Sequence, residues 1–202
     1  MVRYLADPAN AITAAGLLFS ALGLHFALSG HLELAVATVL WAMLCDHLDG
    51  VVAVRTRNRA ADTARIGKSL DGLADLLYGA IFPAIVVMQE GRQGLLASIA
   101  GAALVLAGAL RLSYFSNFGL SSDGRFTGVP LSYDVPVLAV LFLVRGWLPA
   151  DLFPPVLSLV FLALAILHVS SIRVPALSGA MYGVVTVFSV LASGALAIQG
   201  WA

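Results

Sequence analysis

The stretch CDHLDGVVAVRTRNRAADTARIGKSLDGLADL, residues 45–76, contains five aspartates, and four of them lie at the ends of two long apolar segments. Asp46 and Asp49 are three residues apart and Asp71 and Asp75 are four apart, so each pair shares one face of a helix. A carboxylate inside a bilayer costs about 2.5 to 3.5 kcal/mol on insertion scales, so four together need compensation. Divalent metal ions are the compensation that we expect.

The composition of the whole chain is that of a membrane protein. Of 202 residues, 60% are hydrophobic, and the mean hydropathy is +0.97. A soluble domain of this size cannot bury so much apolar surface. The formal net charge is zero, which gives no basic excess for binding nucleic acid. We therefore expect residues 1–202 to form a single all-α integral membrane domain without a nucleic-acid partner.

Seven apolar segments follow one another along the chain. We predict helices at residues 11–28, 32–54, 70–89, 95–112, 134–148, 155–172 and 176–199. Most of them approach the roughly 20 residues needed to span a bilayer, but the fifth is short. The prediction is a polytopic bundle of six to eight transmembrane helices, with polar connections at residues 55–69 and 113–133.

The basic residues predict the orientation of this bundle. With a cytoplasmic N-terminus, only Arg92 and Arg145 would lie outside. The remaining basic residues would face the cytoplasm: Arg3, Arg55, Arg57, Arg59, Arg65, Lys68, Arg111, Arg125 and Arg173. The positive-inside rule favours this arrangement. We therefore expect a multi-pass protein of the cell membrane, with the catalytic motif 46–75 at the cytoplasmic ends of helices two and three.

The types of the four acidic residues indicate which metal they would bind. Carboxylate oxygens suit hard cations such as Mg²⁺ and Mn²⁺, and the sequence has no His or Cys cluster that would favour zinc. His47 lies between Asp46 and Asp49 and is turned to a different helical face, so we do not expect it to be a ligand.

Small residues next to the aspartates leave room for a ligand at the backbone. Gly50 follows Asp49, Ala53 comes about one turn later, and Gly67 precedes the second pair. A pyrophosphate could approach the helices closely there. The alternative is helix packing, because small residues also let membrane helices approach each other.

These residues resemble the signature of the CDP-alcohol phosphatidyltransferase family, also called CDP-alcohol phosphotransferases. In that signature D-x-x-D-G-x-x-A-R is followed by G-x-x-x-D-x-x-x-D. The matching residues are Asp46, Asp49, Gly50, Ala53, Gly67, Asp71 and Asp75. Val54 stands where the family has arginine, Arg55 comes one residue later, and the gap from Asp49 to Gly67 is longer than usual.

Further stretches resemble the phosphatidylserine synthase branch of the family. DPANAITAAGLLFSALGL (residues 7–24) is similar to the start of the family's first helix. ALRLSYFSNFG (residues 109–119) and FTGVP (residues 126–130) resemble its RLARFN and F-x-G-L-P elements. The resemblance implies an enzyme of phospholipid biosynthesis. It would transfer a phosphatidyl group from CDP-diacylglycerol to the hydroxyl of a small polar acceptor, first of all L-serine, and release CMP.

The resemblance also implies roles for individual residues. Asp46, Asp49, Asp71 and Asp75 would hold two Mg²⁺ or Mn²⁺ ions, and Asp75 would also be the general base for the acceptor hydroxyl. The residues implied for the CDP moiety are Asp46, Gly50, Ala53, Arg55, Gly67 and Asp71. Arg57 or Arg59 could reach the phosphates in place of Arg55. Members of the family are commonly homodimers, so a second copy of the chain is a possible partner.

Several alternatives remain at this point. The acceptor could be inositol phosphate, glycerol phosphate or another alcohol, and the donor could be a water-soluble CDP-alcohol. Arg111, at the end of the fourth predicted helix, could bind the acceptor, or it could be an arginine that snorkels to the membrane surface.

Two rival functions explain less of the sequence. An ion-coupled transporter would need acids near the midplane and, usually, repeated halves. The aspartates instead cluster toward one membrane face, and we find no second copy of the motif. A structural membrane protein whose acids pair with the arginines of residues 55–69 would explain the charges but not the ordered glycines.

Overall fold

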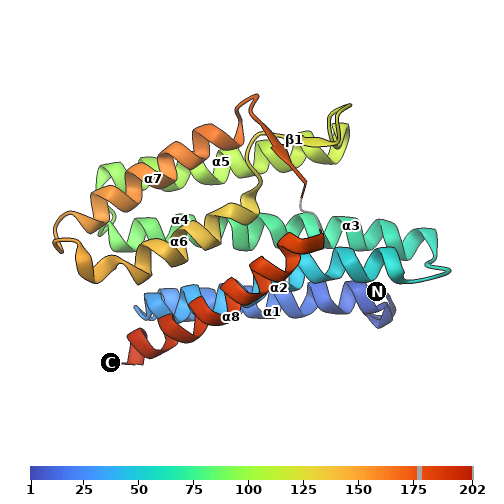
Figure 1. Cartoon of the computed structure of the whole chain (residues 1–202), viewed down its shortest axis with the longest axis horizontal. Coiled ribbons are helices and arrows are strands. Elements are labelled where there is room, and N and C mark those ends of the chain that lie inside the picture. The colour runs from blue at the N-terminus through green and yellow to red at the C-terminus, as the bar shows by residue number, and fades with distance from the viewer. Residues whose placement is uncertain (177–178, 202) are drawn as a thin grey trace.

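Helices make up most of the computed structural model, which describes residues 1–176 and 179–201 (Figure 1). The α-helices are α1 (Pro8–Leu28), α2 (Leu32–Arg55), α3 (Ala61–Leu76), α4 (Phe82–Glu90), α5 (Leu95–Phe118), α6 (Asp134–Leu143), α7 (Phe153–His168) and α8 (Gly179–Trp201). Short 3-10 helices cover Val2–Ala6, Leu131–Tyr133 and Arg145–Trp147. The strands β1 (Arg125–Thr127) and β2 (Arg173–Pro175) form an antiparallel pair.

The described residues confirm an all-α polytopic membrane fold. A π-helical turn, Leu77–Ile81, joins α3 to α4, so residues 61–90 form one continuous helix and the described chain has seven helices. Five of them are long and apolar enough to cross a membrane: α1, α2, the continuous α3–α4 helix, α5 and α8. The helices α6 and α7 are shorter, which agrees with the short fifth segment that hydropathy predicted.

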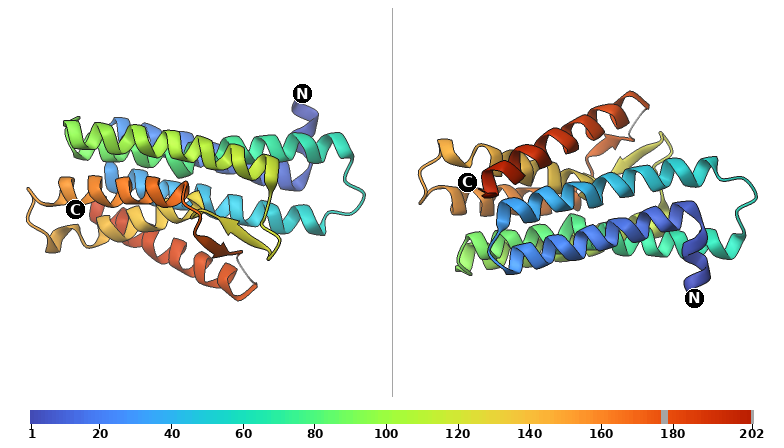
Figure 2. Two further views of the ribbon diagram at one scale, coloured as in Figure 1. Left: turned by 90° about the horizontal axis from the view of Figure 1, so that it is seen from above. Right: turned by 90° about the horizontal axis from the view of Figure 1, so that it is seen from below.

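The helices pack side by side along the long axis of the molecule (Figures 1 and 2). α1 packs on α2, α2 on α8, α5 on α7 and α4 on α5. Large buried side chains such as Tyr78, Phe82, Phe142 and Phe161 fill the space between these helices. The end of α2 and the start of α3 lie together at one end of the bundle, joined by the short connection 56–60.

The predicted start of the third helix was wrong by about two and a half turns. We expected it at residue 70, whereas α3 begins at Ala61. Residues 61–69 (ADTARIGKS) are amphipathic rather than apolar, so a hydropathy argument assigns them to a loop although they are helical. As a result Asp71 and Asp75 lie about three turns or more inside the helix that begins at Ala61, whereas Asp46 and Asp49 lie within the last three turns of α2, as expected.

The other boundaries also differ from the hydropathy prediction. α5 continues to Phe118 into the expected polar connection, α6 ends at Leu143, and α7 ends at His168. Part of the predicted last segment, residues 177–178, lies outside the described residues.

The π-helical turn has a cause in the sequence. Pro83 has no N–H to donate to the carbonyl of Gly79, so the regular hydrogen-bond pattern cannot continue there. A π turn inserts extra backbone and rotates the side chains that precede it. Tyr78, inside this turn, is 1% exposed.

The two-stranded sheet ties the segment after α5 to the segment after α7. Phe126 pairs with Val174, and Arg173 forms an ion pair with Asp123 at 3.0 Å. Hydrogen bonds from Ser121 and Arg173 lower the pKa of Asp123 to about 2. In Figure 1 the sheet lies nearer the middle of the long axis than the end where α3 begins.

Candidate active site

The four aspartates face one another across a single cavity. Asp46 and Asp49 come from α2, Asp71 and Asp75 come from α3, and all four line a cavity of about 300 Å³. The two pairs meet because each occupies one helical face and the two helices are joined by the short connection 56–60. The structure therefore brings together the whole acidic set that the sequence singled out.

A tyrosine that the sequence did not single out connects the two pairs. The hydroxyl of Tyr78 lies 2.8 Å from Oδ2 of Asp46 and 2.9 Å from Oδ1 of Asp75. One hydroxyl hydrogen can serve only one of these carboxylates at a time. The other oxygen of Asp46, Oδ1, is buried and has no hydrogen-bond partner among residues 1–176 and 179–201. Such an unsatisfied acceptor needs an explanation, and a bound cation would supply one.

Asp49 is fixed from a third helix. It is 6% exposed, and the hydroxyl of Thr13 on α1 donates a hydrogen bond to its Oδ2. Thr13 is itself 3% exposed and also lies 3.1 Å from the carbonyl of Ala9. The contact spans 36 residues, so no local spacing in the sequence could have indicated it.

A second cavity, of about 180 Å³, lies between α1, α2 and α3. Among its lining residues are Asp49, Gly50, Ala53, Gly67 and Asp71. Five of the six residues that the resemblance implies for the CDP moiety thus line this cavity or the carboxylate cavity beside it. The exception is Arg55, which is exposed and lines neither.

Arg59 is the arginine that lines this second cavity. Its guanidinium pairs with Asp7 at 3.0 Å and donates to Oδ1 of Asn10 at 2.5 Å. Asp7 is also the N-cap of α1, where it accepts from the backbone N–H of Asn10. The start of α1 therefore fixes this cationic side chain beside the aspartates.

A glycine is required at position 67 because the side chains of Asn10 and Arg59 approach its backbone closely. A Cβ atom at this position would collide with Oδ1 of Asn10 and come within 2.6 Å of the Arg59 guanidinium. Gly67 is buried, whereas Gly72 on the same helix has no atom within 4 Å of such a Cβ. The glycine before the second aspartate pair thus has a steric reason in this fold.

Arg111 comes to the carboxylate cavity from α5. It is 6% exposed, and its guanidinium lies 5.6 Å from the ring centre of Phe126. Its Nε is buried, and no described residue forms a hydrogen bond with it. Arg111 is close enough to Asp75 to interact with it electrostatically. A positively charged group therefore stands opposite the acids in the same cavity, well inside the protein and not at its surface.

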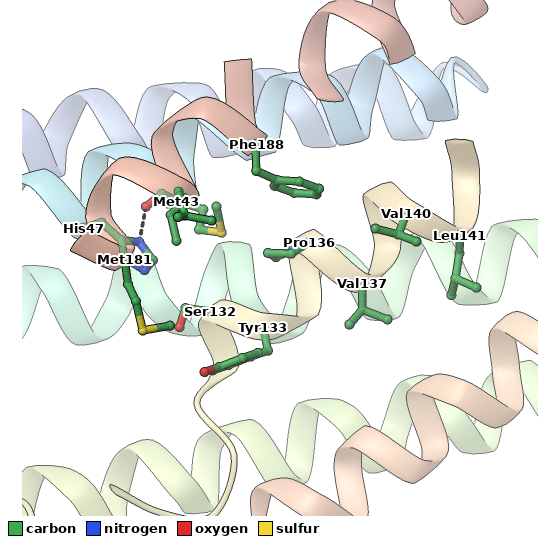
Figure 3. Close-up of a pocket in the computed structure, with 12 residues that line it drawn as sticks. Met43, His47, Ser132, Tyr133, Pro136, Val137, Val140, Leu141, Met181 and Phe188 are labelled. Carbon is green, nitrogen blue, oxygen red and sulfur yellow. Dashed lines mark hydrogen bonds between the residues drawn. The ribbon is translucent and has the colours of Figure 1, made fainter. Parts of the chain in front are cut away.

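A third cavity, of about 420 Å³, is apolar and adjoins the carboxylate cavity. Figure 3 shows that it lies between α2, α6 and α8. Its wall includes Met43, Val137 and Phe188, and it shares His47, Ser132 and Tyr133 with the carboxylate cavity. Nδ1 of His47 lies 2.7 Å from the carbonyl of Met43.

The donor set fits a hard divalent cation in its chemistry. Four carboxylates from two helices line one cavity, and one of their buried oxygens has no partner. Within the described residues, no three His, Cys, Asp or Glu side chains already stand in a metal-binding arrangement. Cation binding would thus require the carboxylates to change rotamer.

Comparison with known proteins extends over nearly the whole chain. The model of the CDP-alcohol phosphatidyltransferase family matches residues 7–192. The chain is similar to an archaetidylserine synthase of Methanothermobacter thermautotrophicus, 32% identical over 160 residues, which cover 78% of this chain and 65% of that protein. The chain thus spans just under two thirds of the length of this curated relative.

Two further relatives carry the same kind of name. A CDP-diacylglycerol–serine O-phosphatidyltransferase of Helicobacter pylori is 28% identical over 175 residues, which cover 82% of this chain and 70% of that protein. A phosphatidylcholine synthase of Rhizobium meliloti is 27% identical over 160 residues, which cover 78% of this chain and 65% of that protein. Because the family model matches far more than half of the chain, this protein belongs to the CDP-alcohol phosphatidyltransferase family.

Proposed function

We propose that this protein transfers a phosphatidyl group from CDP-diacylglycerol to the hydroxyl of a small polar acceptor, first of all L-serine, and releases CMP. It would be a transferase of phospholipid biosynthesis. The observation that carries the proposal is the meeting of three cavities at one group of carboxylates. Asp49, Gly50 and Asp71 line both the carboxylate cavity and the cavity beside Arg59. His47, Ser132 and Tyr133 line both the carboxylate cavity and the apolar cavity.

The cavity beside Arg59 suits the nucleotide end of the donor. Arg59 and Lys68 bring positive charge to its wall, and Gly50 and Gly67 leave the helix backbone accessible. Arg59 here takes the role that the family resemblance assigned to Arg55, because Arg59 lines the cavity and Arg55 does not.

The apolar cavity supports a lipid donor over a water-soluble CDP-alcohol. Its wall is formed mainly by apolar side chains of α2, α6 and α8, and α2 and α8 are long and apolar enough to cross a membrane. The acyl chains of a lipid donor already lie in the hydrocarbon of the bilayer, so an apolar cavity can accept one without exposing it to water. A soluble donor would leave this surface without an occupant.

The reaction follows from where the three cavities meet. The acceptor oxygen attacks the phosphorus that carries the diacylglycerol, the bond from this phosphorus to the CMP oxygen breaks, and CMP leaves with the electron pair. Asp75 takes the proton of the acceptor hydroxyl. Two Mg²⁺ or Mn²⁺ ions, held by Asp46, Asp49, Asp71 and Asp75, would neutralise the pyrophosphate and the leaving phosphate.

Arg111 would bind the acceptor. It lines the carboxylate cavity together with the acids, and its Nε has no hydrogen-bond partner in the part of the chain that the structure describes. A guanidinium binds a carboxylate in a planar, two-pronged contact, which suits the carboxylate of serine. The names of the archaetidylserine synthase and the serine phosphatidyltransferase support serine, and the phosphatidylcholine synthase supports choline as the alternative.

The cellular setting is also part of the proposal. The positive-inside rule supports a cell-membrane protein in which the connection 56–60 and the nearby carboxylates face the cytoplasm, where soluble acceptors are available. The homodimer that the family resemblance implies stays a prediction.

The test is the release of CMP by the purified protein in detergent micelles, with CDP-diacylglycerol and Mn²⁺ or Mg²⁺. A panel of L-serine, choline, inositol phosphate and glycerol phosphate identifies the acceptor. We expect CMP release that depends on L-serine, and a lipid product that carries serine. Absence of CMP with every acceptor would contradict the proposal.

A further inference from the structure

The segment Gly128–Tyr133, which we call the strap, forms part of the wall of two cavities. Its Ser132 and Tyr133 face both the carboxylate cavity and the apolar cavity, and Pro130 and Leu131 face the carboxylate cavity alone. Leu131 also packs against the π turn: a Cβ atom added to Gly79 would lie 2.8 Å from Cβ of Leu131. The position of the strap therefore sets the shape of the reaction cavity.

A buried His–Asp pair holds this strap. Nδ1 of His168, at the end of α7, lies 2.8 Å from the carbonyl oxygen of Val129. Its Nε2 lies 2.9 Å from Oδ2 of Asp134, at the start of α6. Both side chains are 0% exposed. One imidazole ring thus connects the two ends of the strap to α7.

The contacts of His168 with Val129 and Asp134 limit where the hydrogens of the His168–Asp134 pair can lie. A carbonyl oxygen can only accept, so Nδ1 of His168 must carry a hydrogen and donate it to Val129. The hydrogen bond between Nε2 and Asp134 then contains one shared hydrogen, whether the pair is an imidazolium with a carboxylate or a neutral imidazole with a carboxylic acid. In both forms the ring makes two hydrogen bonds, so the strap stays fixed.

Backbone contacts add to this attachment. The N–H of Gly128 donates to the carbonyl of Ile172 at 2.8 Å, and that of Val129 donates to the carbonyl of Leu167 at 3.1 Å. Gly128 has φ +76°, and a Cβ atom there would collide with the carbonyl oxygen of His168. The start of the strap thus packs closely against the C-terminal end of α7, whose last residue is His168.

The same pair affects the surroundings of Arg111. Asp134 is near enough to Arg111 to interact electrostatically, yet among the described residues Arg111 forms no ion pair. Asp134 is instead engaged by His168 at 2.9 Å. The guanidinium of Arg111 is therefore left available for an anionic group inside the carboxylate cavity.

We propose that His168 and Asp134 are positioning residues for the acceptor, which hold the strap in place and leave Arg111 free to bind the acceptor's carboxylate. This inference rests on the proposed function. Neither residue lines the carboxylate cavity, so neither is assigned to the chemical step. Their loss should weaken acceptor binding more than donor binding, because the nucleotide of the donor is held beside Arg59, in a cavity whose lining includes no strap residue. The strap would meet the donor through its acyl chain, at Ser132 and Tyr133.

The test measures the KM of L-serine and the KM of CDP-diacylglycerol separately for the full-length protein in micelles. We expect His168→Phe and Asp134→Leu to raise the KM of serine about tenfold or more and to change the KM of the donor less than about twofold. Asp134→Asn can donate an amide hydrogen to Nε2 of a neutral His168, so it should restore the KM of serine to within about threefold of wild type.

Phe161→Leu is the matched control, because Phe161 is fully buried on the same helix and lies away from the strap. It should lower thermal stability and leave the ratio of the two KM values unchanged. If the larger substitutions do not fold, His168→Gln keeps a donor for Val129 and loses the Asp134 contact. A serine KM raised about threefold in that variant is then expected.

The outcomes separate this inference from the proposed function. An active wild type in which the His168 and Asp134 variants leave the KM of serine unchanged, or raise both KM values equally, would overturn the inference alone. A wild type that releases no CMP with any acceptor would overturn the proposed function, and this inference with it.

Discussion

Two groups of acidic side chains lie at opposite ends of α2, and they differ in how their charge is balanced. Away from the cavities, Glu33 and Glu90 share one arginine, Arg145, at 3.1 and 2.8 Å. The guanidinium of Arg145 also lies over the rings of Phe142 and Phe153, at 5.7 and 5.1 Å. This cluster is satisfied within the protein and holds the ends of α2, α4 and α6 together.

The carboxylate cavity has no such balance. None of its four aspartates forms an ion pair with an arginine or lysine within the described residues, and Oδ1 of Asp46 is buried without a partner. Unpaired buried charge is costly, so it persists where a ligand completes it. The contrast teaches that paired acids indicate a structural role in this fold, whereas unpaired acids beside cavities indicate the reaction site.

The largest effect is expected for the proposed base. Asp75→Asn removes the group that takes the acceptor proton, so CMP release should fall by roughly 10² to 10⁴. The matched control is Asp62→Asn on the same helix, because the Asp62 side chain is 74% exposed. Initial rates of CMP release measure both variants. Equal losses in the two would remove the distinction between cavity and surface acids.

Substitution of the arginines near the second cavity should affect the KM of the donor according to whether each arginine lines the cavity. Arg59→Met should raise the KM of CDP-diacylglycerol about tenfold, since a charge-assisted contact to phosphate is lost. Arg55→Met and Arg57→Met should change it less, because both side chains are exposed. Arg65→Met, 80% exposed, is the control. A larger rise in the KM of the donor for Arg55→Met than for Arg59→Met would mean that Arg55 binds the phosphates, as the family signature implied.

A substitution in the cluster of Arg145, Glu33 and Glu90 should lower the stability of the protein and leave its catalytic activity unchanged. Arg145→Met leaves Glu33 and Glu90 without their partner, which should cost about 1 to 2 kcal/mol given the partial exposure of Arg145. Thermal unfolding in detergent measures this loss. The KM values and the rate per folded molecule should stay at wild-type levels. A specific loss of CMP release would mean that this end also takes part in the reaction.

The smallest effect is expected at a glycine. Gly67→Ala forces Asn10 and the Arg59 side chain to shift, so the KM of the donor should rise about threefold. Gly72→Ala is the control on the same helix, because its Cβ would meet nothing within 4 Å. The same KM assay compares the two. An equal response would show that the space at Gly67 does not matter for the donor.

The sequence was sufficient for the fold class and for the acidic set. Long apolar segments predict membrane helices because the bilayer imposes their length, and spacings of three and four place aspartates on one face. The sequence did not predict that residues 61–69 are helical. This segment is amphipathic, so its mean hydropathy is low and does not distinguish it from a loop.

The partners of the aspartates could not be predicted for another reason. Tyr78 reaches Asp46 across 32 residues, Thr13 reaches Asp49 across 36, and His168 reaches Asp134 across 34. Such contacts depend on how the helices pack, which no local pattern encodes. His168 has no metal-ligand spacing in the sequence, and only the fold shows that it lies between the carbonyl of Val129 and the carboxyl group of Asp134.

The central claim is that the unpaired aspartates bind metal and the paired glutamates do not. The most direct measurement is titration of the purified protein with Mn²⁺, followed by electron paramagnetic resonance in the presence of CMP. We predict saturable Mn²⁺ binding to wild type and to Glu90→Gln, and its loss in Asp71→Asn. Absence of saturable binding to wild type, or equal binding to Asp71→Asn, would contradict the account.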